Sequence, residues 1–97
     1  MLNSRQRAQL RALANGIDPI FQIGKGGIGD NMAEQVGFAL EKRELVKITV
    51  LETADVTAKE ALEILCKEIG AEPVQAIGRK SVLYKESREN KRIELVR

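Results

Sequence analysis

The strongest constraint on the fold is the alternation of strand-type and helical patterns along the chain. Residues 45–51 (LVKITVL) carry apolar side chains at alternate positions from Val46 to Val50 and again at both ends, which is typical of an interior strand. Residues 30–42 before it and residues 57–69 after it repeat apolar side chains at helical spacing instead. A strand enclosed by two helices indicates a sheet covered by helices, and therefore an α/β fold.

Capping residues and glycines predict where the helices begin and end. A first helix should run from residue 4 to about residue 15, and the pattern Thr57-Ala58-Lys59-Glu60 is that of a capping box at the start of the third helix. The expected cap residues are Ser4, Asp30 and Thr57, and the expected stop residues are Gly16 and Gly70.

Three shorter segments complete the expected sheet. Residues 19–23 (PIFQI) are β-prone, and their proline favours a place near an edge of the sheet. Residues 72–77 and 81–84 flank the basic turn Gly78-Arg79-Lys80, which indicates two antiparallel strands. The predicted order is α-β-α-β-α-β-β, a mixed four-stranded sheet packed by helices in one domain of residues 1–97, with the first two strands parallel. The charged residues 86–97 are either a loose tail or a short capping segment.

Composition argues against an enzyme. Histidine is absent, which removes the commonest general base and the commonest zinc ligand. The single cysteine, Cys66, lies among apolar residues and is expected to be a small buried hydrophobe. A chain of 97 residues has one core and little room for a water-poor catalytic pocket. We therefore expect no catalytic residue, metal, cofactor or small-molecule substrate, no membrane span, and a place in the cytoplasm.

Charge is unevenly distributed along the chain. Residues 1–29 have a net charge of +3, residues 30–76 hold five basic and ten acidic groups, and residues 77–97 have a net charge of +4. A positive face results if the fold brings the two basic ends together. The alternative is a solvated surface of mixed charge.

The segment Gly24-Lys25-Gly26-Gly27-Ile28-Gly29 lies between a predicted strand and a predicted helix. Glycines at such a place allow a ligand to approach the backbone closely, and the positive end of a helix favours a phosphate. Lys25 adds a mobile cation. A tight turn with positive φ angles would account for one or two of these glycines, but not for all of them together with a lysine.

Three kinds of phosphate-binding loop compete for this segment. A nucleotide P-loop needs Ser or Thr after its lysine, whereas Gly26 follows Lys25. Gly24, Gly26 and Gly29 match the dinucleotide fingerprint, and Glu52 lies at a suitable distance, but the chain lacks the second half of a dinucleotide fold. The third kind is a G-x-x-G clamp on a single-stranded RNA backbone, formed by Gly24, Lys25, Gly26 and Gly27.

The rest of the sequence favours contacts with the RNA backbone over base stacking. Phe21, Phe38 and Tyr84 are the only aromatic residues, too few for a sheet that stacks successive bases. The basic residues expected to supplement the loop are Arg7 and Arg11 in the first helix, Arg79 and Lys80 at the turn, and also Lys85 and Arg88.

Three segments together resemble a known family. Gln6-Arg7, residues 19–28 (PIFQIGKGGI) and residues 39–47 (ALEKRELVK) are similar to the CRM domain, the chloroplast RNA splicing and ribosome maturation module, and to its stand-alone bacterial YhbY-like form. The resemblance covers nearly the whole chain and weakens after about Arg88. It implies an α/β fold similar to the C-terminal domain of translation initiation factor three, with RNA bound at the G-x-x-G loop, here residues 24–27.

These observations lead to one hypothesis and two rivals. The hypothesis is a non-catalytic RNA-binding protein of ribosome assembly, whose partners are ribosomal RNA or precursors of the large subunit, together with ribosomal proteins. The first rival is a protein-interaction adaptor that uses the acidic residues of segment 30–76. The second rival is a minimal nucleotide-dependent enzyme.

Overall fold

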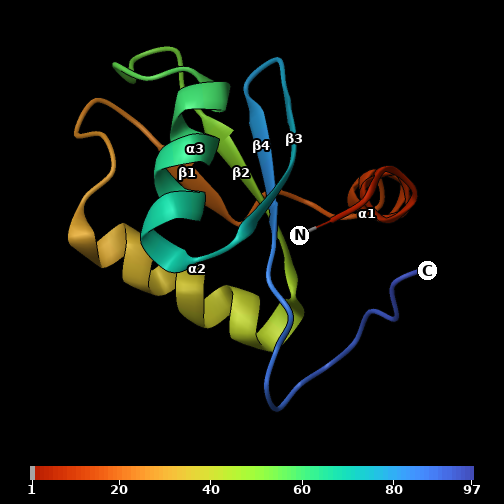
Figure 1. The fold of residues 1–97 in the computed structure, drawn as a ribbon. Helices are drawn as coiled ribbons and strands as arrows, with labels where there is room; N and C mark the ends of the chain where they lie inside the picture. Colours follow the sequence, from red (N-terminus) through yellow and green to blue (C-terminus); the bar gives the residue numbers. More distant parts are fainter. Residues whose placement is uncertain (1) are drawn as a thin grey trace.

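The computed structural model describes residues 2–97, and its elements follow the predicted order (Figure 1). They are α1 (Ser4–Ala14), β1 (Phe21–Ile23), α2 (Asp30–Arg43), β2 (Leu45–Val50), α3 (Ala58–Ile69), β3 (Glu72–Ile77) and β4 (Lys80–Tyr84). The chain forms one compact domain, in which three helices pack on a mixed four-stranded sheet.

The sheet has the strand order β1-β2-β4-β3. β1 runs parallel to β2, as a helical connection between them requires, and the other neighbouring strands are antiparallel. β1 lies at an edge of the sheet, which confirms the edge position predicted from Pro19. The register of β3 on β4 shifts between Pro73 and Gln75, where the strand bulges.

Helices cover both faces of the sheet, so the core has two parts. α2 and α3 pack on one face, and α1 lies on the other (Figure 1). The first core contains Ile23, Val46, Ile48 and Leu83 from the strands, together with the buried faces of α2 and α3. The second core, beneath α1, is made of Leu2, Leu10, Ala14, Leu45, Val74, Val82 and Tyr84. Side chains that alternate along β2 and β4 therefore enter different cores.

Two predicted helix caps are wrong by one residue. Asn3, and not Ser4, caps α1, because the Asn3 side chain accepts a hydrogen bond from the N–H of Gln6 at 2.8 Å. Gly29 precedes α2 as its cap, so Asp30 is the first helical residue. The capping box at the start of α3 is confirmed, and Gly70 ends that helix with a φ of 77°.

The C-terminal segment, residues 85–97, has no regular secondary structure but is attached to the end of α2. The buried carboxylate of Glu44 accepts hydrogen bonds from the N–H groups of Ser87 at 2.8 Å, Arg92 at 2.6 Å and Ile93 at 2.7 Å. The Glu41 carboxylate accepts from the Ser87 hydroxyl and from the N–H groups of Arg88 and Glu89. Two carboxylates thus fix residues 87–93.

The same segment also contacts α1. The side-chain amides of Gln6 and Gln9 donate to the carbonyl oxygens of Val96 and Glu94, each at 2.9 Å. Ile93 and Leu95 pack against the second core. A loose tail does not describe residues 86–97, which cover the space between α1 and the end of α2.

Cys66 is buried in the first core, as expected. Burial, with a smaller effect of the nearby Glu72 carboxylate, raises the pKa of its thiol to about 12. Because only the thiolate reacts, we expect iodoacetamide at pH 8 to modify native Cys66 about a thousandfold more slowly than the denatured chain. Equal rates with and without urea, measured by mass spectrometry, would contradict this prediction.

Candidate functional site

The glycine loop leaves the sheet directly at the end of β1. Lys25 and Gly26 form the centre of a turn, which the N–H of Gly27 closes by donating to the carbonyl oxygen of Gly24 at 2.9 Å. Lys25 and Gly26 are exposed, whereas Gly24 and Gly27 are half-buried. The loop therefore presents its central backbone and one cation to solvent.

The fold itself requires only one of the four glycines of this loop region to be glycine. Gly27 has a φ of 71°, a conformation that side chains rarely adopt. Gly24, Gly26 and Gly29 do not share this conformation, and a Cβ on Gly26 or Gly29 would meet nothing within 4 Å. A Cβ on Gly24 would make an ordinary contact with Leu51 at 3.5 Å. The glycine at position 26 therefore leaves an exposed stretch of backbone uncovered by any side chain of its own.

The N-terminus of α2 lies next to this loop without a side-chain cap. Gly29 offers no side chain, in contrast to the capping boxes of α1 and α3. Within residues 2–97, the N–H groups of Asp30 and Asn31 have no hydrogen-bond acceptor. Free N–H groups and the helix dipole attract an anion there, although the Asp30 carboxylate in the first turn opposes part of this attraction.

Two further loops share this end of the sheet. The β2–α3 connection, residues 51–57, begins beside the glycine loop. The N–H of Leu51 donates to the carbonyl oxygen of Ile23, the residue before the loop, at 2.8 Å. The β3–β4 turn places Arg79 beside this connection, where the guanidinium contacts the Glu52 carboxylate at 2.9 Å. This hydrogen bond and the charge of Arg79 lower the pKa of Glu52. Lys80, the first residue of β4, is exposed.

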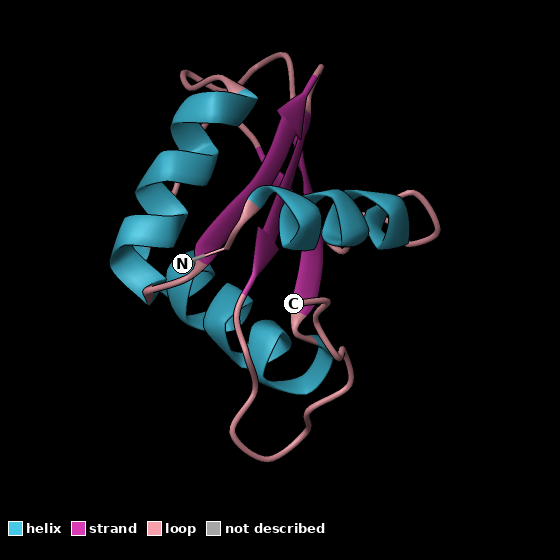
Figure 2. Ribbon diagram, turned by 45° about the vertical axis from the view of Figure 1, so that its right-hand side comes forward, coloured by secondary structure: helices cyan, strands magenta, loops and turns pink. Residues whose placement is uncertain are grey.

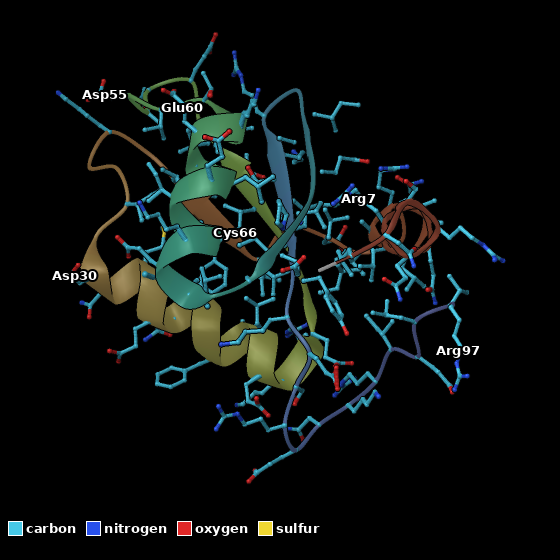
Figure 3. The ribbon with its side chains drawn as sticks, in the orientation of Figure 1. Arg7, Asp30, Asp55, Glu60, Cys66 and Arg97 are labelled. Atoms are coloured by element: carbon cyan, nitrogen blue, oxygen red, sulfur yellow. The ribbon has the colours of Figure 1, made fainter. Side chains whose placement is uncertain are left out.

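Arg7 and Arg11 lie on α1, across the sheet from α2. Because a helix turns by about 100° per residue, they share one flank of α1, while Gln6 and Gln9 lie on the flank that contacts the C-terminal segment. The arginine flank therefore faces the opposite way, toward the end of the sheet that carries the glycine loop. Figure 3 shows Arg7 on the side of α1 that is turned toward the sheet.

Lys85 and Arg88 are not brought to the glycine loop. The Lys85 ammonium donates to the carbonyl oxygen of Ile69 at the end of α3, at 3.0 Å. The N–H of Arg88 is held by Glu41 near the end of α2. Both helices begin at the loop end of the sheet, so these residues lie at the other end. They are wrong as direct supplements to the loop.

Half of the ten carboxylates in residues 30–76 already have partners within the molecule. These five hold the C-terminal segment, Arg79, the start of α3 and the N–H of Leu2, and they are Glu41, Glu44, Glu52, Glu60 and Glu72. Half of the acidic groups in this part of the sequence are therefore engaged in internal contacts, which leaves fewer carboxylates available for an adaptor surface.

Sequence reasoning passed over the polar face of β2. Lys47 and Thr49 alternate with the buried Val46, Ile48 and Val50 and are only half-buried. That alternation was a sufficient signal, because polar residues between buried ones on an interior strand point to the opposite, less covered face.

In residues 2–97 there is no cluster of three or more side chains suited to hold a metal, and no helix long and apolar enough to cross a bilayer.

The chain is similar to several known proteins over almost its full length. It is 48% identical to the Bacillus subtilis protein named "Probable RNA-binding protein YqeI", over 98% of this chain and 99% of the relative. It is 31% identical to a protein of Haemophilus influenzae named "RNA-binding protein", over 93% and 91% of the two chains. The solution structure of the Staphylococcus aureus protein SAV1595 superposes with a TM-score of 0.82, at 51% identity, over 99% of this chain and 100% of that one.

The sequence model of the CRS1/YhbY (CRM) domain matches residues 2–85, which include the glycine loop and all seven elements of the fold. This match agrees with the resemblance noted in residues 19–28 and 39–47. The chain therefore belongs to the CRS1/YhbY (CRM) domain family.

Proposed function

We propose that this protein is a non-catalytic RNA-binding protein that holds the RNA backbone at the loop Gly24-Lys25-Gly26-Gly27. The observation that carries the proposal is Gly26: it is exposed, and neither its backbone conformation nor its neighbours require a glycine. A missing side chain on an open surface is useful to a ligand that must approach the backbone. The names of the relatives, which describe them as RNA-binding, support RNA as that ligand.

The proposed mechanism is capture of phosphate oxygens. The free N–H groups at the start of α2 donate to one phosphate, and the Lys25 ammonium supplies a point charge beside it. Backbone contacts carry little sequence information, so selectivity comes from the shape of the RNA. This arrangement requires no proton transfer and no metal.

We further propose ribosomal RNA, in precursors of the large subunit, as the target in the cytoplasm, with ribosomal proteins as neighbours. The resemblance of residues 19–28 and 39–47 to the ribosome maturation module supports this assignment. Crosslinking the protein to RNA in cells and sequencing the attached fragments tests it. Fragments spread over messenger RNAs, with none from the large subunit, would refute the ribosomal target while leaving RNA binding intact.

Alanine in place of Lys25 tests the clamp. We expect RNA affinity to fall about fivefold, and the slope of log affinity against log salt to decrease by about 0.7, the value for one lost contact on a single strand. Lys42→Ala, which removes another exposed cation, in the last turn of α2, is the matched control. Affinity is measured by fluorescence anisotropy of a labelled RNA. Equal affinities for the two variants would remove the loop from the binding site.

A further inference from the structure

The face of the sheet that carries α1 is only partly covered. The buried residues Leu10 and Ala14 of α1 pack near the start of β2 and the end of β4, where Leu45 and Tyr84 are buried. Figure 2 shows α1 crossing the sheet, while the strand ends beyond it lie open on that side. Those open ends are the ones next to the glycine loop and the β3–β4 turn (Figure 1).

A row of polar side chains crosses three neighbouring strands on this open part, and Ile77 of β3 lies at its end. The strand register places Gln22 of β1 beside Thr49 of β2, Thr49 opposite Lys80 of β4, and Lys80 opposite Ile77 of β3. Lys47, two residues before Thr49, lies on the same face. We call Gln22, Lys47, Thr49 and Lys80 the sheet strip. The strip spans the three neighbouring strands β1, β2 and β4, and the two spacings between them make it about 10 Å wide.

The neighbours of these residues show that the strip lies on the α1 side of the sheet. Ser81 points to the α3 side, because its hydroxyl donates to the carbonyl oxygen of Ala58 at 2.7 Å, so Lys80 points to the α1 side. Ile23 is buried in the first core, so Gln22 points away from it. Gln22 and Lys80 are exposed, while Lys47 and Thr49 are half-buried.

The charge of the strip suits a polyanion. It holds two lysines and no carboxylate, and within residues 2–97 neither lysine makes a salt bridge or a side-chain hydrogen bond. Lys47 also lines a hollow of about 510 Å³ between α1, β2 and the C-terminal segment, which Asp18, Arg43 and Arg92 border as well, and no ion pair joins Asp18 to Lys47. Gln22 and Thr49 add neutral groups that can hydrogen-bond to ribose hydroxyls and base edges.

The strip joins two groups of proposed RNA contacts that are otherwise separate. At one side, β1 leads directly from Gln22 through Ile23 into the glycine loop. At the other side lies α1, whose Arg7 is on the side turned toward the sheet in Figure 3, and Arg11 shares that flank because it follows one helical turn later. The aromatic residues lie elsewhere: Phe21 packs on the first core, Tyr84 is buried under α1, and Phe38 is exposed on α2.

From this placement we infer that the RNA strand held at the glycine loop continues over the sheet strip toward Arg7 and Arg11. The ligand is single-stranded RNA, bound by its phosphates and riboses and not by stacked bases. The inference rests on the proposed function and extends it, because it gives the bound strand a direction and a length. A G-x-x-G loop alone accommodates about four nucleotides, so the strip matters only for a longer strand.

The test is the double variant K47Q/K80Q, with K42Q/K67Q as a control that removes two exposed cations from the far ends of α2 and α3. Fluorescence anisotropy is measured with labelled single-stranded oligouridylates of about 12 and about four nucleotides. We expect K47Q/K80Q to bind the longer RNA about tenfold more weakly than the control, with a salt slope smaller by about 1.4. For the short RNA, the two double variants should bind equally.

The outcomes separate this inference from the proposed function. If Lys25→Ala weakens binding while K47Q/K80Q matches its control on the longer RNA, the strip is refuted and the loop retained. Equal losses for both double variants would show a general effect of charge and also refute the strip. A protein that binds neither oligouridylate refutes the RNA path and the clamp together. Thermal unfolding of each variant, with midpoints close to that of the wild type, shows that a measured loss arises from binding.

Discussion

Glutamine in place of Glu44 is expected to lower the free energy of unfolding by about 3 kcal/mol, although it changes one atom of one side chain. The carboxylate uses both oxygens: Oε2 accepts from Ser87, and Oε1 accepts from Arg92 and Ile93. A glutamine has only one oxygen, so its NH₂ group must face at least one N–H donor. The side chain is fully buried, and water cannot replace the lost acceptor.

Urea unfolding followed by circular dichroism measures this difference. Glu63→Gln, on the exposed surface of α3, is the matched control and should change stability by less than about 0.5 kcal/mol. A difference between the two variants smaller than about 1 kcal/mol would show that the C-terminal segment does not depend on the Glu44 carboxylate.

The pH dependence of stability provides a second readout of the same contacts. Burial alone would raise the pKa of Glu44, but the N–H groups of Ser87, Arg92 and Ile93 outweigh it and hold the pKa below the usual value of 4.5. A carboxyl with a lowered pKa in the folded state stabilises the protein fully above its unfolded pKa, and this contribution is lost as pH falls through the folded pKa. We therefore expect stability to decrease below about pH 4.5, and to decrease less steeply in the Glu44→Gln variant.

Alanine in place of Gly26 is expected to weaken RNA binding by about tenfold or more without destabilising the fold. The added methyl group meets no atom of the protein within 4 Å, and the backbone conformation of Gly26 is one that alanine adopts. Replacing glycine at such a position slightly stabilises a protein, by about 0.5 kcal/mol, because the unfolded chain loses freedom. The methyl group does lie where the RNA backbone is proposed to approach the loop.

Gly16→Ala is the matched control for this experiment. Gly16 follows α1, lacks a positive φ, and its nearest neighbour for an added Cβ is the Leu13 oxygen at 3.7 Å. Gly27→Ala is unsuitable, because the φ of 71° would mix backbone strain with the loss of binding. If Gly26→Ala binds RNA as tightly as Gly16→Ala, close approach to residue 26 is not part of recognition.

Local patterns were sufficient to predict the elements of the fold. The spacing of apolar residues in α3 and the alternation in β2 follow directly from burial on one face, and the parallel pairing of β1 follows from the connecting helix. The caps of α1 and α2 were misplaced by one residue because neighbouring residues, Asn3 and Ser4 or Gly29 and Asp30, both suit that position. Only the tertiary placement of the chain decides between them.

The site was less accessible to prediction than the fold, because its parts meet through long-range contacts. Lys85 and Arg88 are close in sequence to Lys80, but β4 carries the chain to the opposite end of the sheet. Nothing local in the sequence indicates that a segment more than 40 residues later needs the carboxylate oxygens of Glu44. The sheet strip likewise exists only through strand register, which aligns residues from three separate strands.

The division of the core into two parts has a consequence for the order in which the protein assembles during translation. The first core uses residues from Ile23 to Leu83, whereas the second needs Leu2 and Leu10 together with Val74, Val82 and Tyr84. α1 therefore lacks most of the surface on which it docks until β3 and β4 have been synthesised. We expect it to join the folded sheet late, and the C-terminal segment, bonded to both Gln9 and Glu44, to secure it last.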